Sequence, residues 1–176
     1  MTQKTQIIDK QGYRHNVGII LCNQKDQLFW ARRIGEDAWQ FPQGGVRVKE
    51  SLKTAMYREL NEEIGLCSND VEIIGSTNDW LHYKLPIQYI DHERKPLCIG
   101  QKQIWFMLRL ITHEKKVCLT KSKKPEFDGW CWTNYWEPIN RVVSFKRDVY
   151  QHALEELESI LYPDQNHHHG YRNVKR

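Results

Sequence analysis

The chain has 176 residues, of which 40% are hydrophobic and 27% are charged, and its formal net charge is +4. This composition indicates one globular domain and excludes a disordered chain, a membrane helix of roughly 20 apolar residues and an apolar secretion signal. The five cysteines form no C-x-x-C pair, which argues against a disulfide framework or a zinc site and favours reduced thiols in a cytoplasmic protein. The basic charge is compatible with a polyanionic substrate such as a nucleotide or RNA.

The first elements predicted along the chain are short strands. Residues 17–22 (VGIILC) and 27–31 (QLFWA) read as two strands, and the polar residues 23–26 between them predict a hairpin turn. Residues 39–45 (WQFPQGG) indicate a third strand that runs into a glycine turn.

A helix is predicted over residues 51–64. Leu52, Met56, Leu60 and Ile64 recur at helical spacing, and Gly65 suits the position just after a helix. Further strands are expected at residues 71–76, at 104–111 and at 127–135. The second of these is long and apolar enough to be central in a sheet.

A second helix is predicted from about Arg147 to a residue before Pro163, with Ser144 as the residue that caps its start. Its expected buried stripe consists of Val149, Ala153, Leu157, Ile160 and Leu161. The residues after Pro163 are polar and basic and favour a loose tail, in which three histidines need not bind a metal. Strands mixed with two helices indicate an α+β sandwich or a mixed sheet with helices on its faces.

Three glutamates gather on the second half of the first helix. Glu59, Glu62 and Glu63 are spaced i, i+3 and i+4, so they occupy one arc of roughly 100° beside the apolar stripe. Like charges in such an arc repel one another, whereas a divalent cation would reverse the sign of that energy. Carboxylate oxygens are the ligands that Mg²⁺ and Mn²⁺ prefer. A solvated acidic helix face is the alternative for an isolated cluster of this kind.

The surroundings of the cluster favour a site. Arg58 can pair with Glu62 one turn on or reach back to Glu50, and Gly44 and Gly45 would let bare backbone approach a ligand. The whole segment 44–66 (GGVRVKESLKTAMYRELNEEIGL) resembles the Nudix box. The fixed positions of that motif are matched by Gly44, Glu50, Arg58, Glu59, Leu60, Glu62, Glu63, Gly65 and Leu66. The chain is therefore identified as a member of the Nudix hydrolase family.

The resemblance implies a fold and an activity. The expected fold is the Nudix fold, an α/β/α sandwich of the α+β class with a mixed sheet between helices. The expected activity is attack of water on a phosphoanhydride bond with the help of Mg²⁺ or Mn²⁺.

Segments outside the box resemble bacterial RNA pyrophosphohydrolases from about Gly12 to Tyr162. They are GYRHNVGI (12–19), WQFPQGG (39–45), NDWLHYKLP (78–86), IGQKQIWF (99–106), PEFDGW (125–130) and VVSFKRDVY (142–150). This resemblance implies an N-terminal extension at 1–11, a Nudix hydrolase domain at 12–162 and a basic tail at 163–176.

The same resemblance assigns roles to the acidic residues. Glu59, Glu62 and Glu63 are expected to be catalytic metal ligands, joined by the Gly44 carbonyl and by Glu126 from a distant loop. Glu126 could instead be a simple turn residue, and which carboxylate accepts the proton of water stays open. The residues expected to be structural within the motif are Gly45, Glu50, Arg58 and Gly65.

Substrate binding is assigned by resemblance to cations, one amide and one aromatic ring. These residues are Arg14, Arg33, Lys84, Gln101, Phe145 and Lys146. Arginine suits phosphate oxygens, and Phe145 would stack on a base near the 5′ end, although it could also be a hydrophobic staple of the last helix. Ala38 departs from relatives that often carry a small hydroxyl residue there.

Three functions are weighed. The first is conversion of RNA with a 5′ triphosphate or diphosphate to 5′-monophosphate RNA, which would promote mRNA decay. The second is hydrolysis of dinucleoside polyphosphates by the same helix, and the third is RNA binding without catalysis, against which the intact glutamates argue. The resemblance also implies a protein partner that stimulates the enzyme. The chain is expected to be a monomer and not to bind a membrane.

Overall fold

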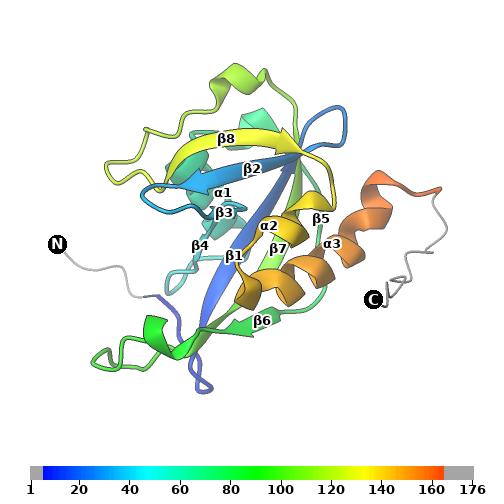
Figure 1. Ribbon diagram of the computed structural model, residues 1–176. Coiled ribbons are helices and arrows are strands. Elements are labelled where there is room, and N and C mark those ends of the chain that lie inside the picture. Colours follow the sequence, from blue (N-terminus) through cyan, green and yellow to red (C-terminus); the bar gives the residue numbers. More distant parts are fainter. Residues whose placement is uncertain (1–5, 165–176) are drawn as a thin grey trace.

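Strands and helices of the computed structural model, which describes residues 6–164, are shown in Figure 1. The strands are β1 (Tyr13–Cys22), β2 (Leu28–Arg33), β3 (Trp39–Gln40), β4 (Gln43–Gly45), β5 (Val71–Ser76), β6 (Leu81–Lys84), β7 (Gly100–Leu110) and β8 (Phe127–Thr133). The helices are α1 (Leu52–Ile64), α2 (Glu137–Arg141) and α3 (Arg147–Leu161). Single 3-10 turns are η1 (Ser68–Asp70), η2 (Ile87–Tyr89), η3 (Glu114–Lys116) and η4 (Ser144–Lys146).

The two longest strands form the centre of one mixed sheet. β1 and β7 run parallel, in a register that pairs Tyr13 with Gly100 at one end and Cys22 with Arg109 at the other. The remaining pairs are antiparallel, with β2 and β4 on β1, and β5 and β6 on β7. β7 is therefore central, as its apolar sequence predicts, although it begins at Gly100 rather than at Ile104.

Alternate residues of the central strands feed two separate cores. Ile19 and Leu21 belong to the core that contains the apolar face of α1, whereas Ile20 and Cys22 belong to the core under α2 and α3. This follows from the strand period of two, since each strand is apolar on both faces. Figure 1 shows α1 and α3 on opposite sides of the sheet, which confirms the expected α/β/α sandwich.

Helix α1 is bounded as its sequence predicts. The Ser51 hydroxyl accepts a hydrogen bond from the Thr54 N–H at 3.1 Å, which satisfies one of the free donors of the first turn. At the other end Gly65 is left-handed, with φ of 77°, and its N–H donates to the Asn61 carbonyl. The helix that carries the three glutamates is thus fixed at both ends.

Three sequence predictions are corrected in detail. Residues 39–45 form two strands rather than one, because Pro42 has no N–H for a ladder and its carbonyl accepts from the Ile19 N–H at 2.9 Å instead. Ser144 does not cap α3, since it begins η4 and the cap position is taken by Lys146 without a side-chain bond. The aromatic strand that begins at Phe127 ends at Thr133, two residues early.

The buried face of α3 is wider than the predicted stripe. Tyr150 and Leu154 are fully buried together with Val149, Ala153 and Leu157, whereas the predicted Ile160 and Leu161 are only partly buried. The helix contacts β6 and β5, and its last turns pack against Gly75 of β5 through Leu157 and Ile160. Strand β6 and helix α2 were not predicted, because four and five residues are too short for a clear period.

The expected N-terminal extension is in part an element of the domain. The Ile7 N–H donates to the Val46 carbonyl at 3.1 Å, the His15 N–H donates to the Ile7 carbonyl at 2.9 Å, and Ile7 packs on the α1 core. Residues 165–176 of the expected tail lie outside the described part of the chain. Within residues 6–164 no helix is long and apolar enough to cross a bilayer. All five cysteines are free thiols.

Candidate active site

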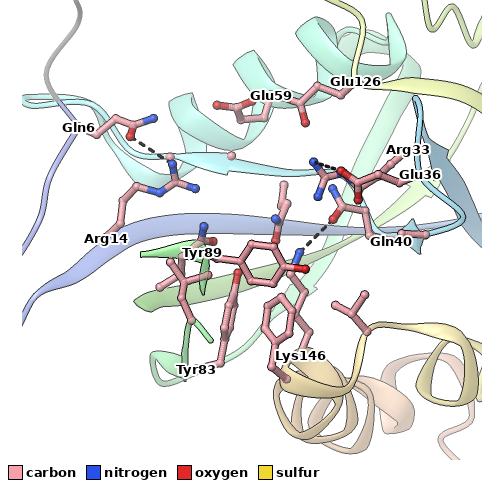
Figure 2. A pocket seen from close by; sticks show the side chains of 18 of the residues that line it. Gln6, Arg14, Arg33, Glu36, Gln40, Glu59, Tyr83, Tyr89, Glu126 and Lys146 are labelled. Atoms are coloured by element: carbon pink, nitrogen blue, oxygen red, sulfur yellow. Dashed lines mark hydrogen bonds and ion pairs between the residues drawn. The ribbon is translucent and has the colours of Figure 1, made fainter. Parts of the chain in front are cut away.

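A single cleft brings most of the predicted site residues together. Its volume is about 610 Å³, and it lies between α1, the strands β3 and β4, and the turns that flank β6 and α3. Figure 2 shows Glu59 and Glu126 on one side of this cleft and Tyr83 and Lys146 on the other. The predicted residues that line it are Arg14, Arg33, Ala38, Gly44, Gly45, Arg58, Glu59, Glu62, Gln101, Glu126, Phe145 and Lys146.

Glu63 is the most deeply buried of the three helix carboxylates, with 3% of its surface exposed. One oxygen accepts a hydrogen bond from the Gln43 N–H at 2.9 Å, whereas the other is buried without a partner. Burial raises the pKa of Glu63 well above its usual value, and the nearby charges of Glu126 and Glu59 raise it further. The Gln43 side chain is held in turn by Gln103 of β7 at 2.8 Å.

Glu59 lies directly under Gly44 of β4. A β carbon added at Gly44 would collide with the Glu59 carboxylate, so the motif needs a glycine there for space rather than for backbone freedom. Glu59 is 9% exposed, and burial raises its pKa to about 7 even though it accepts a hydrogen bond from Arg58. Two of the three glutamates are therefore carboxylates held in a place that disfavours their charge.

Arg58 connects several residues of the motif through hydrogen bonds. Its Nε donates to Glu50 at 2.7 Å and one terminal nitrogen donates to the Gly45 carbonyl at 2.8 Å. The other terminal nitrogen reaches Glu59 and, at 3.3 Å, Glu62. The expected Glu50–Arg58 ion pair is present, and the same guanidinium also neutralises part of the charge on the acidic cluster.

Glu126 reaches the helix carboxylates from the far end of the chain. It precedes β8, and its backbone carbonyl accepts from the Ile34 N–H at 3.0 Å, which fixes the segment beside the end of β2. The Glu126 carboxylate lies near enough to Glu63 for its charge to raise the pKa of Glu63, and it lines the cleft beside Glu59. Long-range pairing of β8 with β2 thus supplies the fourth acid.

These acids fit a hard divalent cation, although the side chains are not yet arranged as ligands. Among residues 6–164 no three His, Cys, Asp or Glu side chains converge on one point, and Glu59 and Glu62 are hydrogen bonded to Arg58 and Arg47 respectively. Glu63 has a buried oxygen without a partner, and burial together with the neighbouring acids raises the pKa values of Glu59 and Glu63, so a cation placed among these acids would be stabilised. Carboxylate oxygens of this kind are the ligands that Mg²⁺ and Mn²⁺ prefer.

The opposite wall carries the cations. Lys146 is 6% exposed and donates to the Gln40 amide oxygen at 3.0 Å, and burial lowers its pKa to about 8, with Arg33 and Arg14 lowering it further. Arg14 donates to Gln6 at 3.2 Å while its Nε is buried without a partner. Arg33, which pairs with Glu36 at 3.4 Å, and Arg14 line the same cleft as Lys146, and these cations are complementary to a chain of phosphates.

Two of the other predicted substrate residues lie in the cleft and one does not. Gln101 is buried with a free amide oxygen, and the Phe145 ring is half-buried against the α3 core. Lys84 is exposed and lies outside the residues that line the cleft, because it follows Tyr83 in β6 and neighbouring residues of a strand point to opposite faces. A role for Lys84 in RNA binding stays a prediction.

Several lining residues were missed in the sequence. They are Gln6, Glu36, Trp39, Gln40, Gln43, Arg47, Tyr83, Leu85, Tyr89 and Val143. Gln43 sits inside the quoted WQFPQGG segment, and Tyr83 inside NDWLHYKLP, so both could have been found from the segments that carry the resemblance. Tyr89 and Gln6 lie in stretches with no such signal.

Comparison with known proteins places this cleft in a family. The model of the NUDIX domain matches residues 12–153. A protein of Hahella chejuensis named RNA pyrophosphohydrolase is 53% identical over 156 residues, which cover 89% of this chain and 97% of that one. The protein of the same name from Proteus mirabilis is 51% identical over 175 residues, with 96% and 99% covered.

Solved structures share the fold at low identity. The dihydroneopterin triphosphate pyrophosphohydrolase of E. coli superposes with a TM-score of 0.63 at 18% identity, covering 78% of this chain and 92% of that chain. A NUDIX hydrolase from Nitrosomonas europaea gives a TM-score of 0.60 at 13% identity, with 84% and 89% covered. The fold, the motif and the relatives agree: the chain belongs to the Nudix hydrolase family, in the subfamily of bacterial RNA pyrophosphohydrolases.

Proposed function

We propose that this enzyme removes pyrophosphate, or successive phosphates, from the 5′ end of triphosphorylated or diphosphorylated RNA and leaves 5′-monophosphate RNA. The observation that carries the proposal is the division of one cleft into an acidic wall on α1 and a cationic, aromatic wall around Lys146. The relatives named RNA pyrophosphohydrolase, at 51% to 53% identity, support the choice of RNA over other phosphoanhydrides.

Nudix hydrolases generally depend on a divalent metal cation. In this chain we assign Mg²⁺, with Mn²⁺ as a substitute, to Glu59, Glu62, Glu63 and Glu126 with the Gly44 carbonyl as a further oxygen. When bound, such a cation neutralises phosphate oxygens and lowers the pKa of water. One Glu63 oxygen accepts a hydrogen bond from the Gln43 N–H, which keeps the other oxygen turned to the cluster. Hydrogen bonds from Arg58 keep Glu59 and Glu62 in place.

The cations of the opposite wall hold the polyphosphate. Lys146, Arg33 and Arg14 neutralise its charge, and a bound phosphate would favour the charged form of Lys146, whose pKa burial has lowered. Gln101 has a free amide oxygen for a ribose or water, and Phe145 offers a ring face to a base. Binding across the cleft brings the phosphoanhydride bond to the acids, where water attacks phosphorus.

In the cell the product would enter mRNA decay. A 5′-monophosphate end exposes a transcript to endonucleases that sense this group, so the reaction belongs in the cytoplasm. We further propose that residues 12–162 form the catalytic domain, that the enzyme acts as a monomer, and that a protein partner stimulates it.

The test is product analysis by thin-layer chromatography. RNA labelled at its γ phosphate should release labelled pyrophosphate or phosphate in the presence of Mg²⁺, and diadenosine pentaphosphate should react more slowly at equal concentration. Faster turnover of the diadenosine compound would make the enzyme a dinucleoside polyphosphate hydrolase instead.

A variant pair ties the reaction to the acidic wall. Glu63→Gln should lower turnover by about 100-fold or more, since it removes charge where a catalytic acid acts. The control Glu72→Gln makes the same chemical change at an exposed residue of β5 that lies outside the cleft, and it should leave turnover unchanged. If Glu63→Gln retained the parent rate, the assignment of the catalytic wall would be wrong.

A further inference from the structure

Three aromatic rings form a row along the wall that carries Lys146. The ring centre of Tyr83 lies 5.8 Å from that of Phe145, which lies 5.9 Å from that of Tyr89. Exposure rises along the row, from 6% at Tyr83 to 63% at Tyr89. All three residues line the cleft, and Figure 2 shows Tyr89 on the side of Tyr83 and Lys146, facing Glu59 and Glu126.

Core packing explains the first two rings and leaves the third without a structural reason. Tyr83 is buried in the α3 core and Phe145 packs against that core, whereas Tyr89 rests on Phe145 and otherwise faces solvent. The residue sits on a fixed turn, since its N–H donates to the Pro86 carbonyl at 2.9 Å and the Ile90 N–H donates to the Ile87 carbonyl at 3.1 Å. These bonds fix the backbone at Tyr89, and the exposed ring lies at the cleft against Phe145.

The chemistry around Tyr89 suits a nucleobase. Cations in the same wall neutralise phosphates, and an open aromatic face binds any base by stacking without a need for hydrogen bonds. An RNA 5′ end presents consecutive bases, of which Phe145 can stack on one. The Tyr89 ring continues the same surface outward, where a neighbouring base would lie.

We propose that Tyr89 forms a second base-stacking site, which binds a nucleotide next to the one that stacks on Phe145. This inference rests on the proposed function, because it requires an RNA substrate with more than one base. Stacking at this position adds affinity for RNA that a single nucleotide cannot use.

The test compares triphosphorylated RNA that lacks one base at the first, second or third nucleotide. Tyr89→Ala should lower kcat/KM on intact RNA by about tenfold, within the range for loss of one stacked base. The loss should vanish on the one substrate whose missing base is the partner of Tyr89 and persist on the other two. An equal loss on all three substrates, or a loss below about twofold on intact RNA, would overturn the inference.

Matched variants separate stacking from support of Phe145. Tyr89→Phe keeps the ring and should retain the parent kcat/KM, whereas Ile87→Ala truncates a 78% exposed residue of the same turn outside the cleft and should change nothing. The loss of kcat/KM caused by Phe145→Ala should also vanish on one of the base-lacking substrates, but not on the one where the loss caused by Tyr89→Ala vanishes. If both variants coupled to the same base, Tyr89 would only position Phe145 and the second site would not exist.

Failure of this inference differs from failure of the proposed function. If the parent enzyme did not convert triphosphorylated RNA, the proposed function would fall. If the parent converted it and Tyr89→Ala matched the parent on every substrate, only the second stacking site would fall.

Discussion

At the scale of single residues, two adjacent glycines have different tasks. A side chain at Gly44 would displace the Glu59 carboxylate, whereas a β carbon at Gly45 would meet only the far end of the Gln6 side chain, at 2.7 Å. Gly44→Ala should therefore lower turnover by about 100-fold with a small change in melting temperature, because it would displace a carboxylate that we propose as a metal ligand. Gly45→Ala is the control and should cost much less activity. Equal losses in the two variants would show that the collision with Glu59 does not matter.

The buried acids also predict how metal-free enzyme responds to pH. Burial raises the pKa of Glu59 from 4.5 to about 7, and that of Glu63 is raised as well. At pH values between 4.5 and about 7 the folded chain binds more protons than the unfolded chain, so the free energy of unfolding falls as pH rises. In the presence of a chelator, the melting temperature should decrease from about pH 5 to pH 8.

The substitution Glu59→Gln removes one of these titrating groups and checks this dependence. It should flatten the fall of melting temperature with pH, and Mg²⁺ should raise the melting temperature of the parent most at the high-pH end. A melting temperature of metal-free parent enzyme that rises over the same range would contradict the prediction.

At the scale of elements, the end of α1 depends on one left-handed residue. A β carbon at Gly65 would add strain at φ of 77° and would approach Cys118 at 2.8 Å, whereas Gly35 has φ of 74° with open space around it. Gly35→Ala should cost roughly 1 kcal/mol for the backbone alone. Gly65→Ala should cost more, because the segment at Cys118 must also move. Denaturant unfolding measures both, and equal costs would exclude a role for the Cys118 contact.

At the scale of the whole molecule, charge should make RNA binding depend on salt. The net charge is only +4, but Arg14, Arg33 and Lys146 are concentrated in the cleft. Each phosphate contact to single-stranded RNA contributes a slope of about −0.7 in log affinity against log salt. Removing Arg33 with Arg33→Gln should make the slope for triphosphorylated RNA less steep by about 0.7. The control Arg32→Gln alters a neighbour that pairs with Asp128 outside the cleft and should keep the parent slope.

Local patterns determined much of the fold and the acidic wall. The helix with Glu59, Glu62 and Glu63 followed from spacing and end signals, because its cap, its stripe and Gly65 are all local. The central strands followed from apolar runs. Short elements such as β6 are too short to show a hydrophobic period. The break between β3 and β4 at Pro42 could not be predicted, because it depends on the pairing of Pro42 with Ile19 of β1.

The sequence by itself determined the family, the helix and the three glutamates that we propose as metal ligands, since these depend on the order of neighbouring residues. Only the tertiary structure decided what faces them. Glu126 reaches Glu63 through the pairing of β8 with β2, and Tyr83 rather than Lys84 enters the cleft because of the face that β6 presents. The burial that shifts the pKa values of Glu59 and Lys146 likewise comes from chain segments far apart in sequence, which no local pattern contains.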